Sequence, residues 1–126
     1  MTIWAKTFGI LGSVNAALAV ILGAFGAHAL KARLSPELLA VYQTGVQYHF
    51  YHGLGLLLVA ALASYAPRSI ALKWSGVVMQ VGILLFSVSL YALSLSGIRW
   101  IGAITPFGGL AFIAAWVLLA LAMWRS

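Results

Sequence analysis

Cysteine and aspartate are absent from this chain, and Glu37 is its single acidic residue. Without cysteine the chain has no disulfide framework, no thiolate metal site and no cysteine nucleophile. A carboxylate pair for acid–base catalysis is also impossible, and Glu37 is the one acid able to orient a catalytic histidine. We therefore expect that the protein is not an enzyme.

Charge of either sign is scarce. Charged residues make up 6% and apolar residues 64% of the 126 residues, and the mean hydropathy is +1.09. A soluble domain carries about 25% charged residues and about half apolar ones. Long apolar runs at 10–30, 77–95 and 108–124 suit helices of about 20 residues that cross about 30 Å of hydrocarbon. The chain is therefore predicted to be an integral membrane protein, with the lipid bilayer as its main solvent.

The net charge of +6 comes from basic residues that lie in the gaps between the apolar runs. Lysine and arginine flank membrane-spanning helices in this way, whereas nucleic-acid-binding proteins gather them on one face or segment. No nucleic-acid partner is expected. The basic residues are Lys6, Lys31, Arg33, Arg68, Lys73, Arg99 and Arg125.

The fold predicted is an all-α integral membrane protein of four transmembrane helices in a compact bundle, forming one domain over 1–126. Prolines and capping residues mark the gaps: Ser35 and Thr105 each precede a proline, as N-caps do. The longest helix would measure about 45 Å at 1.5 Å per residue, so we expect 36–45 in the headgroup region and 46–65 in the membrane. The four helices are expected at about 7–29, 36–65, 73–95 and 106–124.

Four crossings place both termini on one side of the membrane. Four of the basic residues then lie on the terminal side and three on the other. The positive-inside rule favours cytoplasmic termini, in an inner (cytoplasmic) membrane.

Polar side chains are concentrated in the stretch Gln47-Tyr48-His49-Phe50-Tyr51-His52, which this topology places in the outer half of the membrane. At 100° per residue, Tyr48, His49 and His52 share one flank of the helix, whereas Gln47 and Tyr51 share another with Gln43. Uncompensated polar groups in hydrocarbon cost several kcal/mol each. These flanks are therefore expected to face other helices, water or another subunit. Tyr91 and Arg99 complete this predicted polar cluster.

A ligand site is the alternative interpretation of the same stretch. Two histidines three residues apart on a helix can bind one metal ion, with His28 as a third ligand. Haem or a quinone held by His28, His49, His52 and Tyr48 is a second form of this hypothesis. A small oligomeric transporter or channel using Gln47, His52 and Arg99 is a third hypothesis.

Small residues recur on the first and last helices. Ala19, Gly23 and Ala27 are four residues apart, with Gly26 beside them, and Gly108-Gly109 opens the last helix. Such small-xxx-small patterns let helix backbones approach closely. We predict helix-packing seams at both places.

Four motifs resemble those of a known family: GAFGAH at 23–28, YHFYHGLGLLL from Tyr48, LFSVSLYALSLSG from Leu85 and TPFGGLAFIAAW from Thr105. Together they resemble the YgdD-type family of small inner-membrane proteins of unknown function (DUF 423, related to the TMEM 256 type). The resemblance implies a four-helix inner-membrane protein and supplies no activity and no site residues. The favoured hypothesis is a non-enzymatic accessory or assembly protein that packs against other membrane proteins or forms a homo-oligomer.

Overall fold

The computed structural model of residues 1–126 is entirely helical, without β-strands. The turn η1 is π-helical and continues α1, and η2 is a short 3₁₀-helix before α4. The prediction of an all-α protein with four long helices is confirmed. In chain order the helices are α1 (Ile3–Phe25), η1 (Gly26–Leu30), α2 (Pro36–Leu62), α3 (Ile70–Ser96), η2 (Arg99–Ala103) and α4 (Thr105–Arg125).

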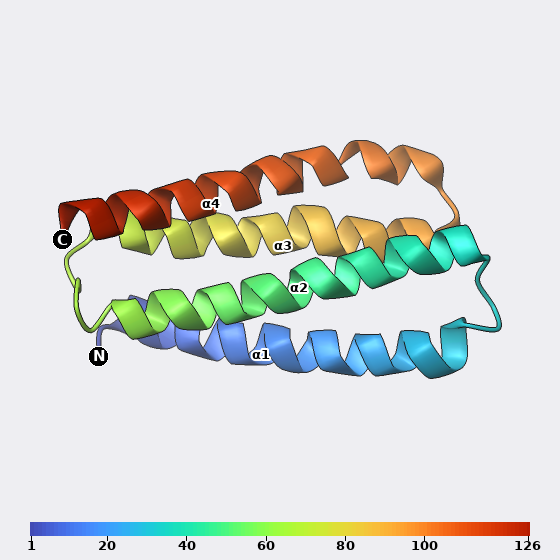
Figure 1. Ribbon diagram of the computed structural model, residues 1–126, viewed down its shortest axis with the longest axis horizontal. Helices are drawn as coiled ribbons and strands as arrows, with labels where there is room; N and C mark the ends of the chain where they lie inside the picture. The colour runs from blue at the N-terminus through green and yellow to red at the C-terminus, as the bar shows by residue number, and fades with distance from the viewer.

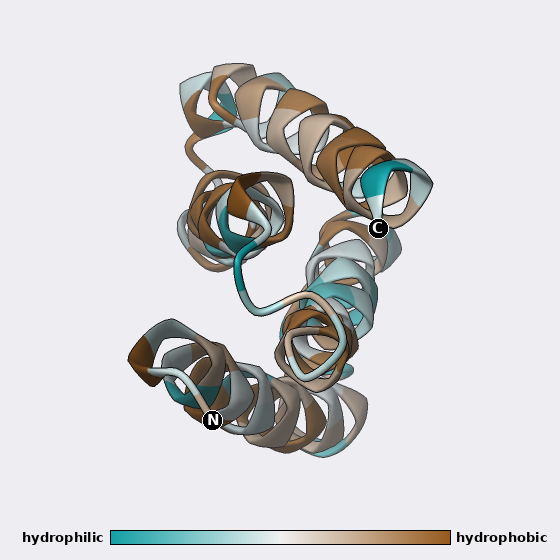
Figure 2. Cartoon of the chain, turned by 90° about the vertical axis from the view of Figure 1, so that its left-hand side faces the viewer, coloured by the Kyte–Doolittle hydropathy of each residue, from teal (hydrophilic) through white to brown (hydrophobic).

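The four long helices run antiparallel to their neighbours in sequence (Figure 1). Both termini and the loop at 63–69 lie at one end of the bundle, and the loops at 31–35 and 97–104 lie at the other. Each helix packs mainly on the next, α1 on α2, α2 on α3 and α3 on α4. Seen end-on, α1 and α4 lie on opposite sides of the molecule (Figure 2). The bundle is thus a staggered row of helices and not a closed square.

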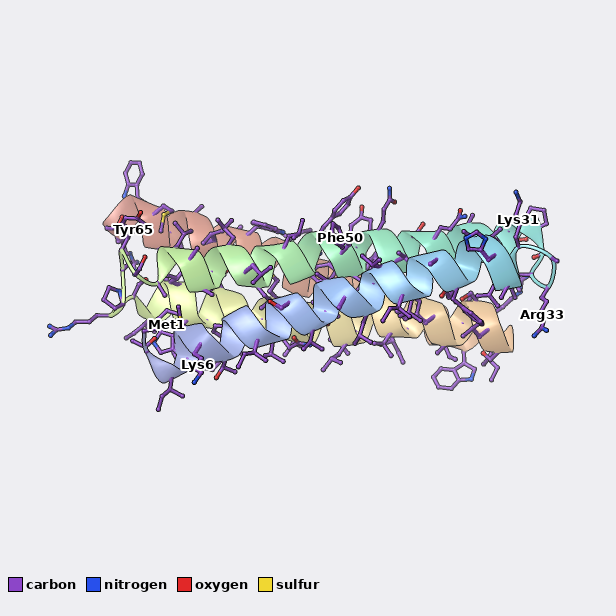
Figure 3. All side chains as sticks on the ribbon, turned by 90° about the horizontal axis from the view of Figure 1, so that it is seen from below. Met1, Lys6, Lys31, Arg33, Phe50 and Tyr65 are labelled. Carbon is purple, nitrogen blue, oxygen red and sulfur yellow. The ribbon has the colours of Figure 1, made fainter.

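Three segments are long and apolar enough to cross a membrane, namely Ile3–Leu30, Ile70–Ser96 and Arg99–Arg125. The chain is therefore a membrane protein with at least these three candidate spans. The second helix, α2, is longer than a span needs but less apolar, because it carries the polar stretch at 47–52. Basic side chains lie at both ends of the bundle, where Figure 3 shows Lys6 at one end and Lys31 with Arg33 at the other.

Side-chain caps fix three of the helix starts. The Ser35 hydroxyl accepts a hydrogen bond from the Leu38 amide at 3.2 Å, as the sequence predicts for a proline-started helix. Thr2 and Ser69 cap α1 and α3 in the same way, so these helices begin at Ile3 and Ile70, earlier than expected. At the other end α2 stops at Leu62, because the next residues form i→i+3 turns.

The prediction that Thr105 caps the last helix is wrong. No side chain caps α4, which follows the 3₁₀-helix η2 with a helical residue, Ile104, at its start. The Thr105 hydroxyl instead pairs with the Ser89 hydroxyl of α3 at 2.6 Å. Because η2 already leads into the helix, Thr105 is free to join α4 to α3.

Glycines set how closely α1 approaches α2. A Cβ on Gly12 would lie 2.8 Å from the carbonyl oxygen of Gly53 and 2.8 Å from the amide nitrogen of Leu57, both backbone atoms of α2. Such contacts leave no space for a side chain, so this crossing requires glycine. The seam continues through Ala19, which is 1% exposed, and Gly23, which faces Val46.

The end of this seam differs from the predicted one. Ala27 is exposed, and Gly26 is buried with the Tyr42 ring in the space where its Cβ would lie. The small residues that face α2 follow intervals of four and three, so a strict four-residue spacing overshoots by one position. In α4, Gly108 lies against the backbone of α3 at Phe86, whereas a Cβ on Gly109 would meet only the Phe86 ring, at 3.9 Å.

Candidate functional site

The polar stretch at 47–52 lies in the middle of the bundle. His49 is thirteen residues from each end of α2, and the adjacent Phe50 lies between the two charged ends in Figure 3. The sequence suggested a place near one end of the spanning segment, and in the structure 47–52 falls at the centre of α2. Its buried polar side chains, His49 and His52, therefore have to be satisfied inside the protein.

His49 is the centre of a hydrogen-bonded chain across three helices. Its Nε2 lies 2.9 Å from Asn15 Oδ1 on α1, and its Nδ1 lies 2.9 Å from the Tyr91 hydroxyl on α3. Asn15 in turn donates from Nδ2 to Gln80 Oε1 on α3 and to the Leu11 carbonyl, at 2.9 and 2.8 Å. His49 is 4% exposed and Asn15 7%, so the chain ties α1, α2 and α3 together in the interior.

The partners of this chain fix its hydrogen-bond directions. Both Asn15 contacts from Nδ2 end on carbonyl-type oxygens, so Asn15 Oδ1 is the acceptor for His49. His49 then carries its hydrogen on Nε2, and its uncharged Nδ1 accepts the hydrogen of the Tyr91 hydroxyl. Every atom of the imidazole able to hydrogen-bond has a partner, which is the condition for burying a polar group at low cost.

His52 is buried on the side of α2 that faces α4. Its ring stacks on Phe112 with the ring centroids 3.5 Å apart and a 6° angle between the planes. Its Nε2 accepts a hydrogen bond from the Trp116 indole at 3.0 Å, so the ring hydrogen is on Nδ1, which donates to the Tyr48 carbonyl at 2.7 Å. His52 thus also has both nitrogens engaged, with the opposite tautomer from His49.

The three histidines do not form one site. His28 is exposed in the π-helical turn η1, near the level where Tyr42 packs on Gly26. His52 follows Tyr42 by ten residues, which is about 15 Å of helix. No group of three His, Cys, Asp or Glu side chains is placed to hold one metal ion. A metal centre or haem would need new positions for side chains that are already hydrogen-bonded.

The other predicted polar residues are spread over different surfaces. Gln47 and Tyr51 are exposed on the outside of α2, and Gln47 makes no hydrogen bond within the chain. Arg99 is exposed at the start of η2, where it lines an end pocket of about 340 Å³ with Glu37. Gln47, His52 and Arg99, proposed above as pathway groups of a channel, therefore do not line one path inside a single chain.

A groove of about 600 Å³ opens between α2 and α4. Aromatic rings make up most of its wall, and two members of the predicted cofactor cluster, Tyr48 and His52, are part of it. Tyr48 also packs on Phe86 with the ring centroids 4.7 Å apart. The lining residues are Tyr48, Tyr51, His52, Phe86, Gly109, Phe112, Ile113 and Trp116.

Sequence reasoning missed three residues that hydrogen-bond the histidines, Asn15 and Trp116 directly and Gln80 through Asn15. Asn15 and Gln80 stand out in the sequence as amides within apolar helices, and such residues pair with one another inside a bundle. That signal indicates that the two amides are buried, but it does not indicate which residues they bond. Trp116 gave no signal, because tryptophan in a spanning helix is usually read as an apolar or interfacial residue.

Comparison with known proteins identifies relatives along nearly the whole chain. The model of a family described as a protein of unknown function, DUF423, matches residues 22–109. The UPF0382 membrane protein YwdK of Bacillus subtilis is 51% identical over 117 residues, covering 93% of this chain and 95% of the relative. UPF0382 membrane proteins of Staphylococcus saprophyticus and Staphylococcus epidermidis are 46% and 44% identical, over 95% and 93% of this chain and 98% and 94% of their own.

No solved structure is significantly similar to this chain. The resemblance drawn from the four motifs is confirmed by the family match and by these relatives.

Proposed function

The chain belongs to the DUF423 family of membrane proteins of unknown function, and we propose that it is a four-pass protein without enzymatic activity. Its role in this proposal is that of an accessory or assembly protein, which packs against other membrane proteins or against a second copy of itself. The proposed location is the cytoplasmic membrane, with both termini on the cytoplasmic side.

Three features support α2 as the fourth span. It packs between two apolar candidate spans, α1 and α3, and runs antiparallel to both. No Asp, Glu, Lys or Arg occurs between Glu37 and Arg68. Its buried polar groups, His49 and His52, are hydrogen-bonded within the bundle, which offsets the cost of placing them at membrane depth.

The observation that carries the proposal is the location of side-chain polar groups that have no hydrogen-bond partner in the chain. Inside the bundle, Ser87 Oγ is the one buried side-chain polar atom without a partner. On the outer surface of α2, by contrast, Gln43 and Gln47 are exposed and make no hydrogen bond within the chain. An amide facing acyl chains is unfavourable. A protein partner on this face would satisfy it.

The histidines support a non-enzymatic role for a related reason. A general base needs a free nitrogen within reach of the substrate. Both ring nitrogens of His49 and of His52 are occupied by groups of the chain itself. These two residues are better suited to joining helices than to moving protons.

Photo-crosslinking in native membranes tests the proposal. A photo-activatable phenylalanine analogue replaces Leu54, which is 46% exposed on α2, or, as the control, Ile21, which is 62% exposed on α1. Position 54 leaves the Gln47 amide in place, and we expect protein adducts of higher mass from it and none, or far fewer, from position 21. A chain that stays monomeric after irradiation of the position-54 variant would contradict the proposed role.

A quinone-binding protein is a second candidate, favoured by the aromatic groove between α2 and α4. A flat ring could lie against Phe112 and Ile113, with the Tyr48 and Tyr51 hydroxyls as donors to its carbonyls. Haem fits less well, since iron ligation by His52 would break its bond from Trp116. Solvent extraction of protein purified in mild detergent is expected to yield about one quinone per chain. An extract without quinone removes this candidate.

A further inference from the structure

We infer that the partner on the outer face of α2 is a second copy of this chain, in a parallel dimer whose two α2 helices meet along one stripe. This inference rests on the proposed function and specifies its partner. It is carried by the spacing of the exposed residues, by the chemistry of Gln47 and by the distribution of charge.

Exposed side chains on the outside of α2 recur at intervals of three or four residues, with a mean of 3.5 between Ala40 and Ala61. A mean period of 3.5 residues keeps a stripe aligned with a second helix in a left-handed pair, whereas a straight helix repeats every 3.6 residues. We call this set the α2 stripe: Ala40, Gln43, Gln47, Tyr51, Leu54, Leu58 and Ala61.

The α2 stripe is long enough to form an interface across the membrane. From Ala40 to Ala61 it covers about 31 Å of helix at 1.5 Å per residue, which matches the roughly 30 Å thickness of the hydrocarbon layer. Its apolar members, Leu54 and Leu58, are 46% and 42% exposed in the single chain. They would pack against their counterparts in a pair of α2 helices.

Gln47 is the member that favours an identical partner. Its side-chain amide is both a donor and an acceptor, so it can pair with another amide of the same kind. Two copies inserted in the same direction are related by a two-fold axis normal to the membrane, and this axis places each stripe residue opposite itself. A polar residue in such a stripe fixes the register of the pair. Tyr51, one turn along, offers a hydroxyl to the same interface.

The two helices at the ends of the row, α1 and α4, lack this feature. Exposed hydroxyls on α1, those of Thr7 and Ser13, bond to carbonyls of their own helix. The exposed face of α4 carries large apolar residues such as Leu110, Ile113 and Val117, which lipid solvates well. α2 is thus the helix with exposed amides that lack a partner in the chain.

Charge does not oppose association through α2. Although the net charge is +6, the α2 stripe contains no charged residue, and the basic side chains lie at the bundle ends. Two copies can therefore approach along α2 without placing like charges in contact inside the membrane.

The absence of cysteine makes the test direct, because each single-cysteine variant reports one position without background. The purified full chain is reconstituted in phospholipid vesicles at a low protein-to-lipid ratio and oxidised. We expect disulfide-linked dimers from Tyr51→Cys, Leu54→Cys and Leu58→Cys. Matched exposed positions, Ile21→Cys on α1 and Ile113→Cys on α4, are expected to stay monomeric. Equal dimer yields at all five positions, or no dimer on α2, would overturn the inference.

Substitution of the amide tests its part in the dimer. Gln47→Leu keeps the size of the side chain but removes the hydrogen bonds, so the dimer dissociation constant in vesicles is expected to rise about threefold to thirtyfold. Ser13→Ala on α1 is the control and should leave the dissociation constant unchanged. Fluorescence energy transfer between labelled copies measures the dissociation constant of each variant. An unchanged constant for Gln47→Leu would contradict pairing through Gln47.

Failure of this inference can be told apart from failure of the proposed function. If photo-crosslinking from position 54 in native membranes captures a different protein while the purified chain does not dimerise, the inference of a second copy is wrong and the accessory role stands. If neither preparation yields an adduct, both are wrong.

Discussion

His49 of α2 donates its Nε2 hydrogen to Asn15 Oδ1 of α1 across 2.9 Å, halfway along the bundle. Tyr91 also donates to His49, and Asn15 donates to Gln80. These hydrogen bonds connect α1, α2 and α3 at the centre of the bundle. Their loss should therefore affect stability more than the loss of any exposed polar side chain.

Asn15→Ala is expected to destabilise the protein by about 1–3 kcal/mol, since it leaves the buried Nε2–H of His49 without an acceptor. Unfolding by a denaturing detergent in mixed micelles measures the change. Ser13→Ala is the matched control, because Ser13 is exposed on the same helix and bonds only to its own Gly9 carbonyl. Equal stability of the two variants would show that the hydrogen bond between His49 and Asn15 contributes nothing to the free energy of unfolding.

Gly12→Ala is expected to separate α1 from α2. The new Cβ would lie 2.8 Å from the Gly53 carbonyl oxygen, and backbone atoms cannot move aside as a flexible side chain can. Overpacking of this kind costs about 1–3 kcal/mol. Gly9→Ala is the control on the same helix, with Ala60 Cβ at 3.7 Å as its nearest contact. A thermal melt in detergent compares them, and a Gly12→Ala melting temperature no lower than that of Gly9→Ala would contradict the close crossing.

The two termini are expected to face the same compartment, the cytoplasm. This follows if α2 crosses the membrane, since an even number of crossings returns the chain to its starting side. Reporter fusions at either end, active only in the cytoplasm or only outside it, measure the orientation. Opposite signals from the two ends would mean that one of the four helices does not span.

The class of fold could be predicted from the sequence, because the apolar composition identifies lipid as the main solvent and lipid requires helices with satisfied backbone groups. Helix lengths and the position of Pro36 followed from apolar runs and from the Ser35 cap, and both agree with the structure within a few residues. The place of 47–52 along the fold did not follow in the same way. Its polar residues suggested a position near one end of the spanning segment, whereas His49 lies at the centre of α2.

The pairing of polar residues could not be predicted, because it depends on how far each helix slides along its neighbour. That slide is set by contacts such as Gly12 against Gly53, which the sequence reveals only as a surplus of small residues. The same limit hid the role of Trp116, whose indole reaches His52 from α4. Residue types in the cluster were recognised, but their partners required the packing of all four helices.

The central claim is that the polar side chains inside the bundle are satisfied by one another, and the histidine tautomers test it most directly. Solid-state ¹⁵N NMR of the histidine-labelled protein in lipid distinguishes an Nε2–H ring from an Nδ1–H ring and both from an imidazolium. We expect His49 as the Nε2–H form and His52 as the Nδ1–H form, each assigned by loss of its signal in His49→Gln or His52→Gln. A charged ring, or the same tautomer at both positions, would contradict the hydrogen bonds to Asn15 and from Trp116 on which the account depends.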